Sequence, residues 1–212
     1  MYTPPASREK DTIVFHDLID EFGFATLATI GPESLTANHI PLAIERKNGP
    51  KGRLRGHLAK GNPQLKDMQL GVPALAIFQG PHTYISPNLY PSKKEHGKVV
   101  PTWNFVAVHA SGPLTVLEDV KALMDIVGDL TNKHEQASKQ PWKISDAPED
   151  YIQHQLKGII GFEIQIEKLE GKWKMGQNKS NTDRQGTIDG LSESKDSNDR
   201  DVAAIMRDVL SD

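Results

Sequence analysis

Cationic and ionisable side chains follow one another closely where a predicted strand ends. Arg55 and His57 lie on one face of the strand predicted over Arg53–Ala59, and Lys60 comes directly after it. Side chains of this kind hold a phosphate monoester through charge-assisted hydrogen bonds. A solvated basic strand face gives the same pattern, and the spacing alone does not separate the two interpretations.

A short helix is predicted just after this strand. Gly61 permits a tight turn, Asn62 is a favoured N-cap residue, and Pro63 suits the first helical position. The helix is expected to reach about Leu70, and free N–H groups at a helix N-terminus attract anions. The alternative is an ordinary capped helix, in which Asn62 satisfies those N–H groups.

Two tryptophans stand beside side-chain amides. Trp103 precedes Asn104, and Trp173 is followed closely by Gln177 and Asn178. A flat indole can lie against a ring-shaped ligand, while amides can bond both donors and acceptors on its edge. The other interpretation is that the tryptophans cover the ends of a barrel.

His39 lies in the middle of a predicted strand and is a candidate ligand contact, although a lone strand histidine is more often a hydrogen-bonded core residue. The histidines form no HxxxH or HExxH pair and the chain has no cysteine, so we expect no metal site. The serines lie in no GxSxG motif, and no GxGxxG or P-loop motif is present. The residues identify no catalytic group.

The composition is that of an ordinary soluble domain. The chain has 212 residues and a net charge of −3, with 25 basic and 28 acidic residues and no basic stripe that would follow a phosphate backbone. Absence of cysteine excludes disulfides and thiolate catalysis. No signal peptide and no apolar run long enough to span a membrane is evident, which predicts a cytoplasmic protein.

Six strand regions with few helices between them predict an α+β, mostly β fold, a closed or nearly closed antiparallel barrel with peripheral helices. The strands are predicted over Phe24–Ile30, Leu35–Ile44, Arg53–Ala59, Ala74–Phe78, Phe105–Leu117 and Ile159–Lys168. Ser111–Pro113 is expected to be a bulge or turn within the fifth strand. Helices are predicted over Ile13–Phe22, Val120–Leu130 and Pro148–Lys157.

Two segments lie outside this pattern. Gln79–Phe105 is rich in proline, aromatic and ionisable residues, and we expect a long loop that forms a preformed pocket wall. Asn178–Asn198 is polar and is expected to be a mobile or partner-docked linker. Asp199–Leu210 recovers helical spacing, and its apolar stripe must pack on the barrel or on a second subunit.

Several segments together resemble the PaiB family of FMN-binding negative transcriptional regulators. They extend from Met1 to about Leu191 and are MYTPP, FATLAT, ANHIPL, GHLAKGNPQ, the whole run from Ala74 to Phe105, WKMGQN and the Asp183–Arg184 pair. The run from Ala74 to Phe105 is highly specific. The resemblance implies a split β-barrel, related to pyridoxamine-phosphate oxidases, that binds FMN between the subunits of a homodimer.

The resemblance also implies roles for residues of this sequence. The phosphate would lie at Arg55, His57, Lys60 and Gln64, and the partner's C-terminal segment would bring Trp173, Lys174, Gln177 and Asn178 over the flavin. Residues 1–177 would then form the FMN-binding domain, and residues 178–212 the linker and final helix. A serine is expected where Gly176 stands, which puts one hydrogen bond to the cofactor in doubt.

The implied function is that of an FMN-binding negative transcriptional regulator that acts directly or indirectly. The sequence shows no helix-turn-helix, and its charge is negative, so direct binding to DNA has no support in motif or charge. Two alternatives stay open: an FMN-dependent oxidoreductase acting on a small substrate, and a haem-binding or haem-degrading split barrel.

Overall fold

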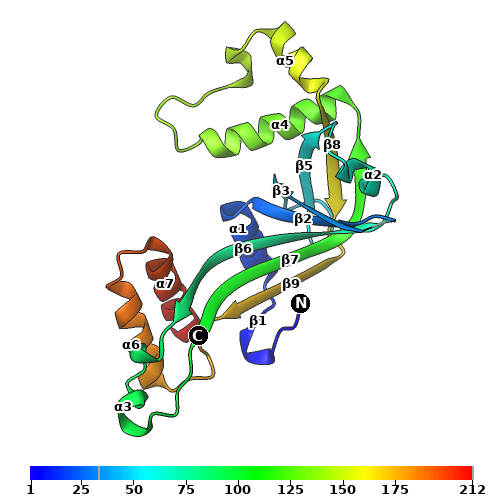
Figure 1. Ribbon diagram of the computed structural model, residues 1–212. Helices are drawn as coiled ribbons and strands as arrows, with labels where there is room; N and C mark the ends of the chain where they lie inside the picture. The colour runs from blue at the N-terminus through cyan, green and yellow to red at the C-terminus, as the bar shows by residue number, and fades with distance from the viewer. Residues whose placement is uncertain (33, 212) are drawn as a thin grey trace. The chain divides into compact units, whose positions relative to one another are not determined.

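The computed structural model describes residues 1–32 and 34–211, which form two compact units interleaved along the chain (Figure 1). The central unit comprises residues 12–78 and 109–169, and the terminal unit comprises residues 1–11, 79–108 and 170–212. The segment expected to be a separate linker and helix therefore shares a unit with the N-terminus. Its last residue, 212, lies outside the described residues.

The central unit holds most of the sheet. Its elements are α1 (Thr12–Glu21), β2 (Phe24–Ile30), β3 (Leu35–Pro41), β4 (Ala43–Glu45), β5 (Arg53–Ala59), α2 (Gln64–Met68), α4 (Val120–Glu135), η3 (Ile144–Asp146), α5 (Glu149–Leu156) and β8 (Ile159–Gln165). Two long strands, β6 (Pro73–Ile85) and β7 (Thr102–Leu117), have residues in both units.

The terminal unit combines the remaining short strands with a helical pair. Its elements are η1 (Pro5–Ser7), β1 (Arg8–Glu9), η2 (Pro87–Leu89), α3 (Ser92–His96), most of β9 (Lys168–Lys174), α6 (Asn181–Ser192) and α7 (Ser197–Ser211). No helix in the described part of the chain is long and apolar enough to cross a membrane.

The strand order is β3-β2-β6-β7-β8-β5-β4, and β9 pairs with β7 and with β1. The pairs with a described register are antiparallel, for example β2 with β3 and β5 with β8. In the described residues the sheet begins at β3 and ends at β4 without closing. The mostly β, α+β fold class is thus confirmed, with a split rather than a closed barrel.

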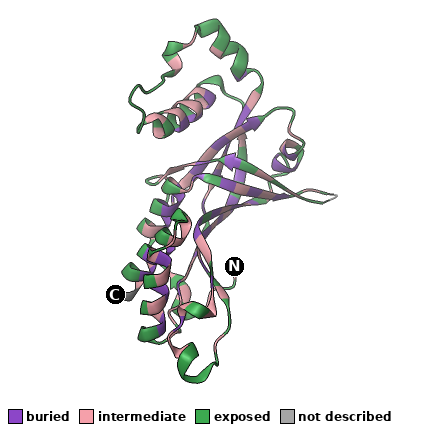
Figure 2. Cartoon of the chain, turned by 60° about the vertical axis from the view of Figure 1, so that its left-hand side comes forward, coloured by how far each residue is buried: buried purple, intermediate pink, exposed green. Residues whose placement is uncertain are grey.

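Buried side chains alternate along the strands, as expected where one face of a sheet packs on a core (Figure 2). The central unit buries Leu27, Leu54 and Phe162 completely. In the terminal unit, Met175 of the segment after β9 and Met206 of α7 are also fully buried. Helix α7 thus buries apolar residues within its own unit, mainly against α6, and its contact with the barrel or with a second subunit stays a prediction.

Several predicted elements are confirmed. β2 and β5 have the predicted ends, and α1, α4 and α5 overlap their predicted ranges. The strand predicted over Leu35–Ile44 is divided into β3 and β4, because its pairing partner changes. The N–H of Leu42 still bonds the carbonyl of Gly23, just before β2 (2.9 Å), whereas Ala43–Glu45 pair with β5. Ser111–Pro113 does not break β7. Gly112 allows a close approach there, since a Cβ at this position would lie 1.9 Å from the carbonyl oxygen of Gln165.

Two predictions about loops are wrong. The long loop is shorter than expected, because β6 continues to Ile85 and β7 already begins at Thr102. The polar segment after residue 178 contains helix α6 rather than a mobile linker. Ser180 caps this helix, and Gly186 and Gly190 let Leu89 of η2 lie directly against it, so tertiary packing overrides a weak helix propensity.

Candidate functional site

The two arginines of β5 are already paired with carboxylates. Glu45 accepts hydrogen bonds from Arg53 (2.6 Å) and Arg55 (2.7 Å). Arg53 also forms an ion pair with Glu163 (2.7 Å), and Arg55 a longer one with Asp129 (3.7 Å). Burial opposes ionisation of Glu45, but the hydrogen bonds from both arginines outweigh it and lower the pKa of its carboxyl. Arg55 lies on the predicted strand face, but its charge is largely offset.

His57 and Lys60 have no acidic partner among the described residues. Nδ1 of His57 is buried without a hydrogen-bond partner in the described structure, and burial lowers the pKa of its imidazole. Lys60 is exposed in the turn after β5. Its backbone N–H donates a hydrogen bond to the carbonyl of Gly158 (2.9 Å), which fixes the backbone of this turn. These two groups remain able to donate to an added anion.

The side chain of Gln64 stabilises the turn after β5 by hydrogen bonds to β2 and β3. It is fully buried, donates to the carbonyl of Leu27 (3.0 Å) and to Thr29 (3.1 Å), and accepts from Asn38 (2.8 Å). Asn62 accepts a hydrogen bond from the N–H of Gln64 (3.0 Å), so it satisfies one free N–H of α2, although the helix begins one residue later than expected and its N-cap position is Pro63. Helix α2 has only five residues, and its contribution to phosphate binding stays a prediction, as does that of Gln64.

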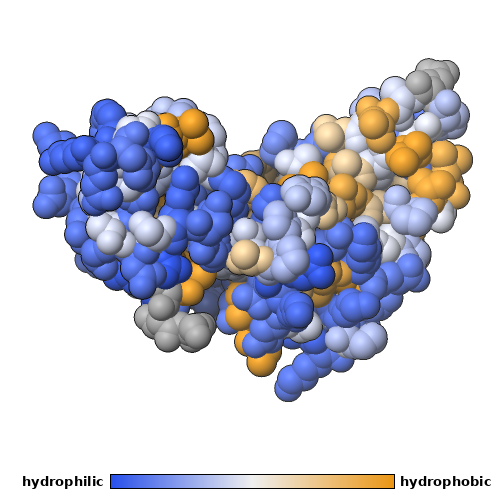
Figure 3. All heavy atoms as spheres, turned by 90° about the horizontal axis from the view of Figure 1, so that it is seen from below, coloured by the Kyte–Doolittle hydropathy of each residue, from blue (hydrophilic) through white to orange (hydrophobic). Residues whose placement is uncertain are grey.

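His39 is exposed rather than part of a hydrogen-bonded core, because it lies on the outer face of β3. The cross-strand pairs of this face are Phe24 with Pro41, Thr26 with His39, Ala28 with Ala37, and Ile30 with Leu35. The large apolar members are strongly exposed: Phe24 by 67%, Ile30 by 61% and Leu35 by 76%. We call these four pairs the outer β2–β3 face. Hydrophobic residues reach the surface at the right-hand end of Figure 3, where this hairpin lies.

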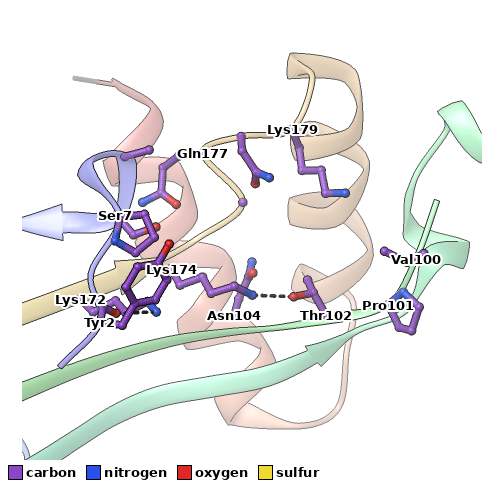
Figure 4. A pocket seen from close by; sticks show the side chains of 14 residues that line it. Tyr2, Ser7, Val100, Pro101, Thr102, Asn104, Lys172, Lys174, Gln177 and Lys179 are labelled. Carbon is purple, nitrogen blue, oxygen red and sulfur yellow. Dashed lines mark hydrogen bonds between the residues drawn. The ribbon is translucent and has the colours of Figure 1, made fainter. Parts of the chain in front are cut away.

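The terminal unit contains a pocket of about 400 Å³. Its lining comes from the N-terminal segment, the start of β7, and β9 with the turn that follows it (Figure 4). The polar and charged lining residues are Tyr2, Ser7, Thr102, Asn104, Lys172, Lys174, Gln177, Asn178 and Lys179. The structure therefore brings Asn104, Lys174, Gln177 and Asn178 of the predicted site together.

Lys172 and Lys174 of this pocket contact oxygen atoms, and Lys172 also lies over the rings of Tyr2 and Phe105. Lys174 donates to Thr102 Oγ1 and to the backbone carbonyl of Trp103, and Lys172 donates to the carbonyl of Tyr2 (3.1 Å). Burial, together with the charges of Lys172 and Lys179, lowers the pKa of Lys174. The pocket thus has an excess of positive charge.

Trp103 and Asn104 point to opposite faces of β7, as adjacent strand residues must. The indole of Trp103 is 53% exposed, stacked against His82 with ring centroids 6.3 Å apart, and meets Tyr84 edge-on at 6.1 Å. Asn104 is 2% exposed on the other face. The two side chains therefore lie on opposite faces of β7, and their contact with a flavin stays a prediction.

The side-chain amide of Gln177 stabilises the turn after β9. Gln177 accepts from the N–H of Met175 (2.8 Å) and donates to the carbonyl of Trp173. Gly176 between them has a φ of 76°, a conformation that suits glycine and strains a serine. Contact of Trp173, Lys174, Gln177 and Asn178 with a flavin stays a prediction.

Sequence reasoning missed Lys172, Lys179, Thr102 and Tyr2 as pocket residues. One signal was available, because lysines two residues apart in a strand share a face, as Lys172 and Lys174 do on β9. The missing step was the recognition of β9 itself. No group of metal-binding side chains is found among the residues that the structure describes.

Comparison with known proteins identifies the family. Residues 1–168 match the family model "Putative FMN-binding domain". The chain is 30% identical over 210 residues to the protease synthase and sporulation protein PAI 2 of Bacillus subtilis, an alignment that covers 99% of this chain and 98% of that protein. It is 37% identical over 212 residues to an uncharacterised protein of Aspergillus fumigatus, covering 80% of this chain and 81% of the relative.

Solved structures with a similar fold include the FAD and haem binding protein from Mycobacterium smegmatis. The TM-score is 0.56 at 16% identity, covering 80% of this chain and 74% of that chain. A conserved hypothetical protein from Mycobacterium tuberculosis gives a TM-score of 0.57 at 13% identity, covering 84% and 92%. At such identities these matches establish the fold, a split barrel, and nothing about ligands.

Proposed function

This chain belongs to the family of FMN-binding domains and is similar over its whole length to PAI 2 of Bacillus subtilis, and we propose that it is a homodimeric flavoprotein that acts as a negative regulator of gene expression. FMN is its cofactor, as family membership supports. The negative regulatory role is the one that the family resemblance of the sequence implies, and the name of the Bacillus relative refers to a protease synthase and to sporulation.

The phosphate of FMN is assigned to His57 and Lys60. The observation that supports this assignment is that both groups lack an acidic partner, whereas Arg53 and Arg55 on the same strand already have one. An exposed ammonium and a partly buried imidazole, three residues apart in the chain, can bind a dianion, while paired guanidinium groups would first have to exchange partners. When bound, FMN would supply redox chemistry; the protein groups would hold and orient it.

Comparison of FMN with riboflavin tests the phosphate assignment, because the two differ only in the phosphate. Charge-assisted hydrogen bonds contribute about 1.5–3 kcal/mol, so Lys60→Ala should weaken FMN binding roughly tenfold or more and barely change riboflavin binding. Lys66→Ala removes the same charge from an exposed lysine of α2 and is the matched control. Equal losses for both ligands would assign Lys60 a structural role instead.

The homodimer is supported by the outer β2–β3 face. An antiparallel face with Phe24, Ile30 and Leu35 open to water is typical of a surface that packs against another chain. Isologous pairs are the commonest assemblies of identical chains, so a second copy is the simplest occupant.

Regulation is proposed to be indirect. The net charge of −3 provides no general attraction to DNA. Deletion of the gene should raise the transcripts of its targets in cells, while the purified FMN-loaded protein should not shift the corresponding promoter fragments at physiological salt. Specific, salt-resistant binding to such a fragment would show direct regulation, and unchanged transcripts would remove the regulatory role.

A further inference from the structure

We propose that the pocket of the terminal unit is a second ligand site, which binds a small organic polyanion that also carries a hydroxyl group. This goes beyond the FMN site and assigns Lys174 and Asn178 a different partner from the flavin that the resemblance suggests. The proposal rests on the proposed function in one respect, because it requires that FMN binds outside this pocket. Three features of the pocket support it: uncompensated lysines, an unsatisfied buried amide, and sufficient volume.

The first feature is charge. No carboxylate lies within ion-pair distance of Lys172 or Lys174 in the described part of the chain. Glu170, on the same face of β9, pairs with the N-terminal ammonium of Met1 (3.0 Å). Lys179 is partly compensated, since its charge helps to lower the pKa of Asp183 against the effect of burial. A pocket whose lining has three lysines and no carboxylate favours an anion with more than one charge.

The second feature is Asn104, which is 2% exposed and lines the pocket. Its Nδ2 makes a weak contact with the sulfur of Met206 (3.4 Å), but its buried Oδ1 has no hydrogen-bond partner in the described structure. If the amide is turned over, one polar atom still lacks a partner. A ligand hydroxyl can either donate or accept, so it satisfies Asn104 in both orientations. Such buried polar atoms normally have partners.

The third feature is space and a free polar lining. The volume of about 400 Å³ is enough for an anion of the size of a tricarboxylate or a sugar phosphate and more than a single ion requires. Asn178 has no side-chain hydrogen bond to a described residue and can contact the ligand. Lys172, Lys174 and Lys179 also lie beyond residue 168, where the match to the FMN-binding family model ends.

Calorimetric titration of the FMN-loaded protein tests the site at low ionic strength. Citrate, ribose 5-phosphate and tricarballylate are the probes, because tricarballylate is citrate without its hydroxyl. At least one of citrate and ribose 5-phosphate should bind. The one with the lower dissociation constant shows whether the natural ligand carries carboxylates or a phosphate. Citrate should exceed tricarballylate by about tenfold if Asn104 takes the hydroxyl. This ligand pair tests the amide without changing a buried residue.

Lys174→Ala should weaken citrate at least about tenfold, since it removes one charged donor. Lys195→Ala removes an exposed lysine of the same unit and should leave the affinity unchanged. Failure of both hydroxylated probes to bind, or equal binding by the Lys174 variant, would overturn the proposal. If FMN displaces citrate and Lys60→Ala leaves FMN affinity unchanged, the pocket is the flavin site and both assignments are wrong.

Discussion

Leu35 is the residue whose replacement should most directly weaken the proposed dimer. Its side chain is 76% exposed and pairs across β2 and β3 with the exposed Ile30. Burial of a leucine side chain contributes about 1.5–3 kcal/mol, so covering the exposed part of Leu35 is worth about 1–2 kcal/mol per subunit. Each residue occurs twice in an isologous interface, so Leu35→Ala should cost about 2–4 kcal/mol, or about 30- to 900-fold in the dimer dissociation constant.

Analytical ultracentrifugation over a dilution series measures that constant for the wild type and the variant. Val120→Ala is the control, because Val120 is also exposed, by 52%, but belongs to α4 and not to the outer β2–β3 face. Leu35→Ala should keep the melting temperature of the wild type at high protein concentration, since an exposed side chain contributes little to the stability of its own subunit.

Two results would refute this reasoning. A wild-type chain that stays monomeric at micromolar concentration would show that the outer face has another occupant. A tight dimer whose dissociation constant does not respond to Leu35→Ala, or responds equally to Val120→Ala, would show that subunits meet elsewhere.

Three further predictions concern the flavin, the fold and pH. FMN binding should quench tryptophan fluorescence, and Trp103→Phe should lose much of that quenching; full loss in Trp173→Phe alone would place the flavin at the other tryptophan. Gly112→Ala should lower the melting temperature strongly in calorimetry, because a Cβ there would lie 1.9 Å from the Gln165 carbonyl oxygen. An unchanged melting temperature would contradict the close approach of these two backbone segments. In the FMN-free protein, burial depresses the folded-state pKa of His57 below its ordinary value of 6.5, so acid protonates the unfolded chain first and stability should fall as pH drops below 6.5. Urea titrations should show that the free energy of unfolding of His57→Gln falls less on acidification than that of the wild type. The same fall in both proteins would show that His57 does not cause this pH dependence.

The fold could be predicted where the sequence pattern is local. β2 and β5 alternate buried and exposed residues along their whole length, so their ends were predictable. The second half of β6 was not, because Gly80, Pro81 and His82 are poor strand formers that depend on tertiary pairing. Helix α6 was hidden for the same reason, since its stability comes from contacts with η2 and α7.

The candidate site was only partly readable for a different reason. The cationic groups of β5 were found from their spacing, but their pairing with Glu45 depends on the neighbouring strand β4 and could not be read locally. The pocket of the terminal unit unites segments from the start, middle and end of the chain. Residue types alone did not show that Asn104 and Trp103 face opposite ways, because that requires knowing that β7 begins at Thr102.

The central claim is that the chain carries FMN, and the visible absorption spectrum of the freshly purified protein tests it most directly. The account predicts the two bands of an oxidised flavin, and FMN as the chromophore released on denaturation and identified by mass. Apo-protein should regain the same spectrum when FMN is added, with one flavin per chain. A Soret band, or a colourless protein that does not take up added FMN, would contradict the account.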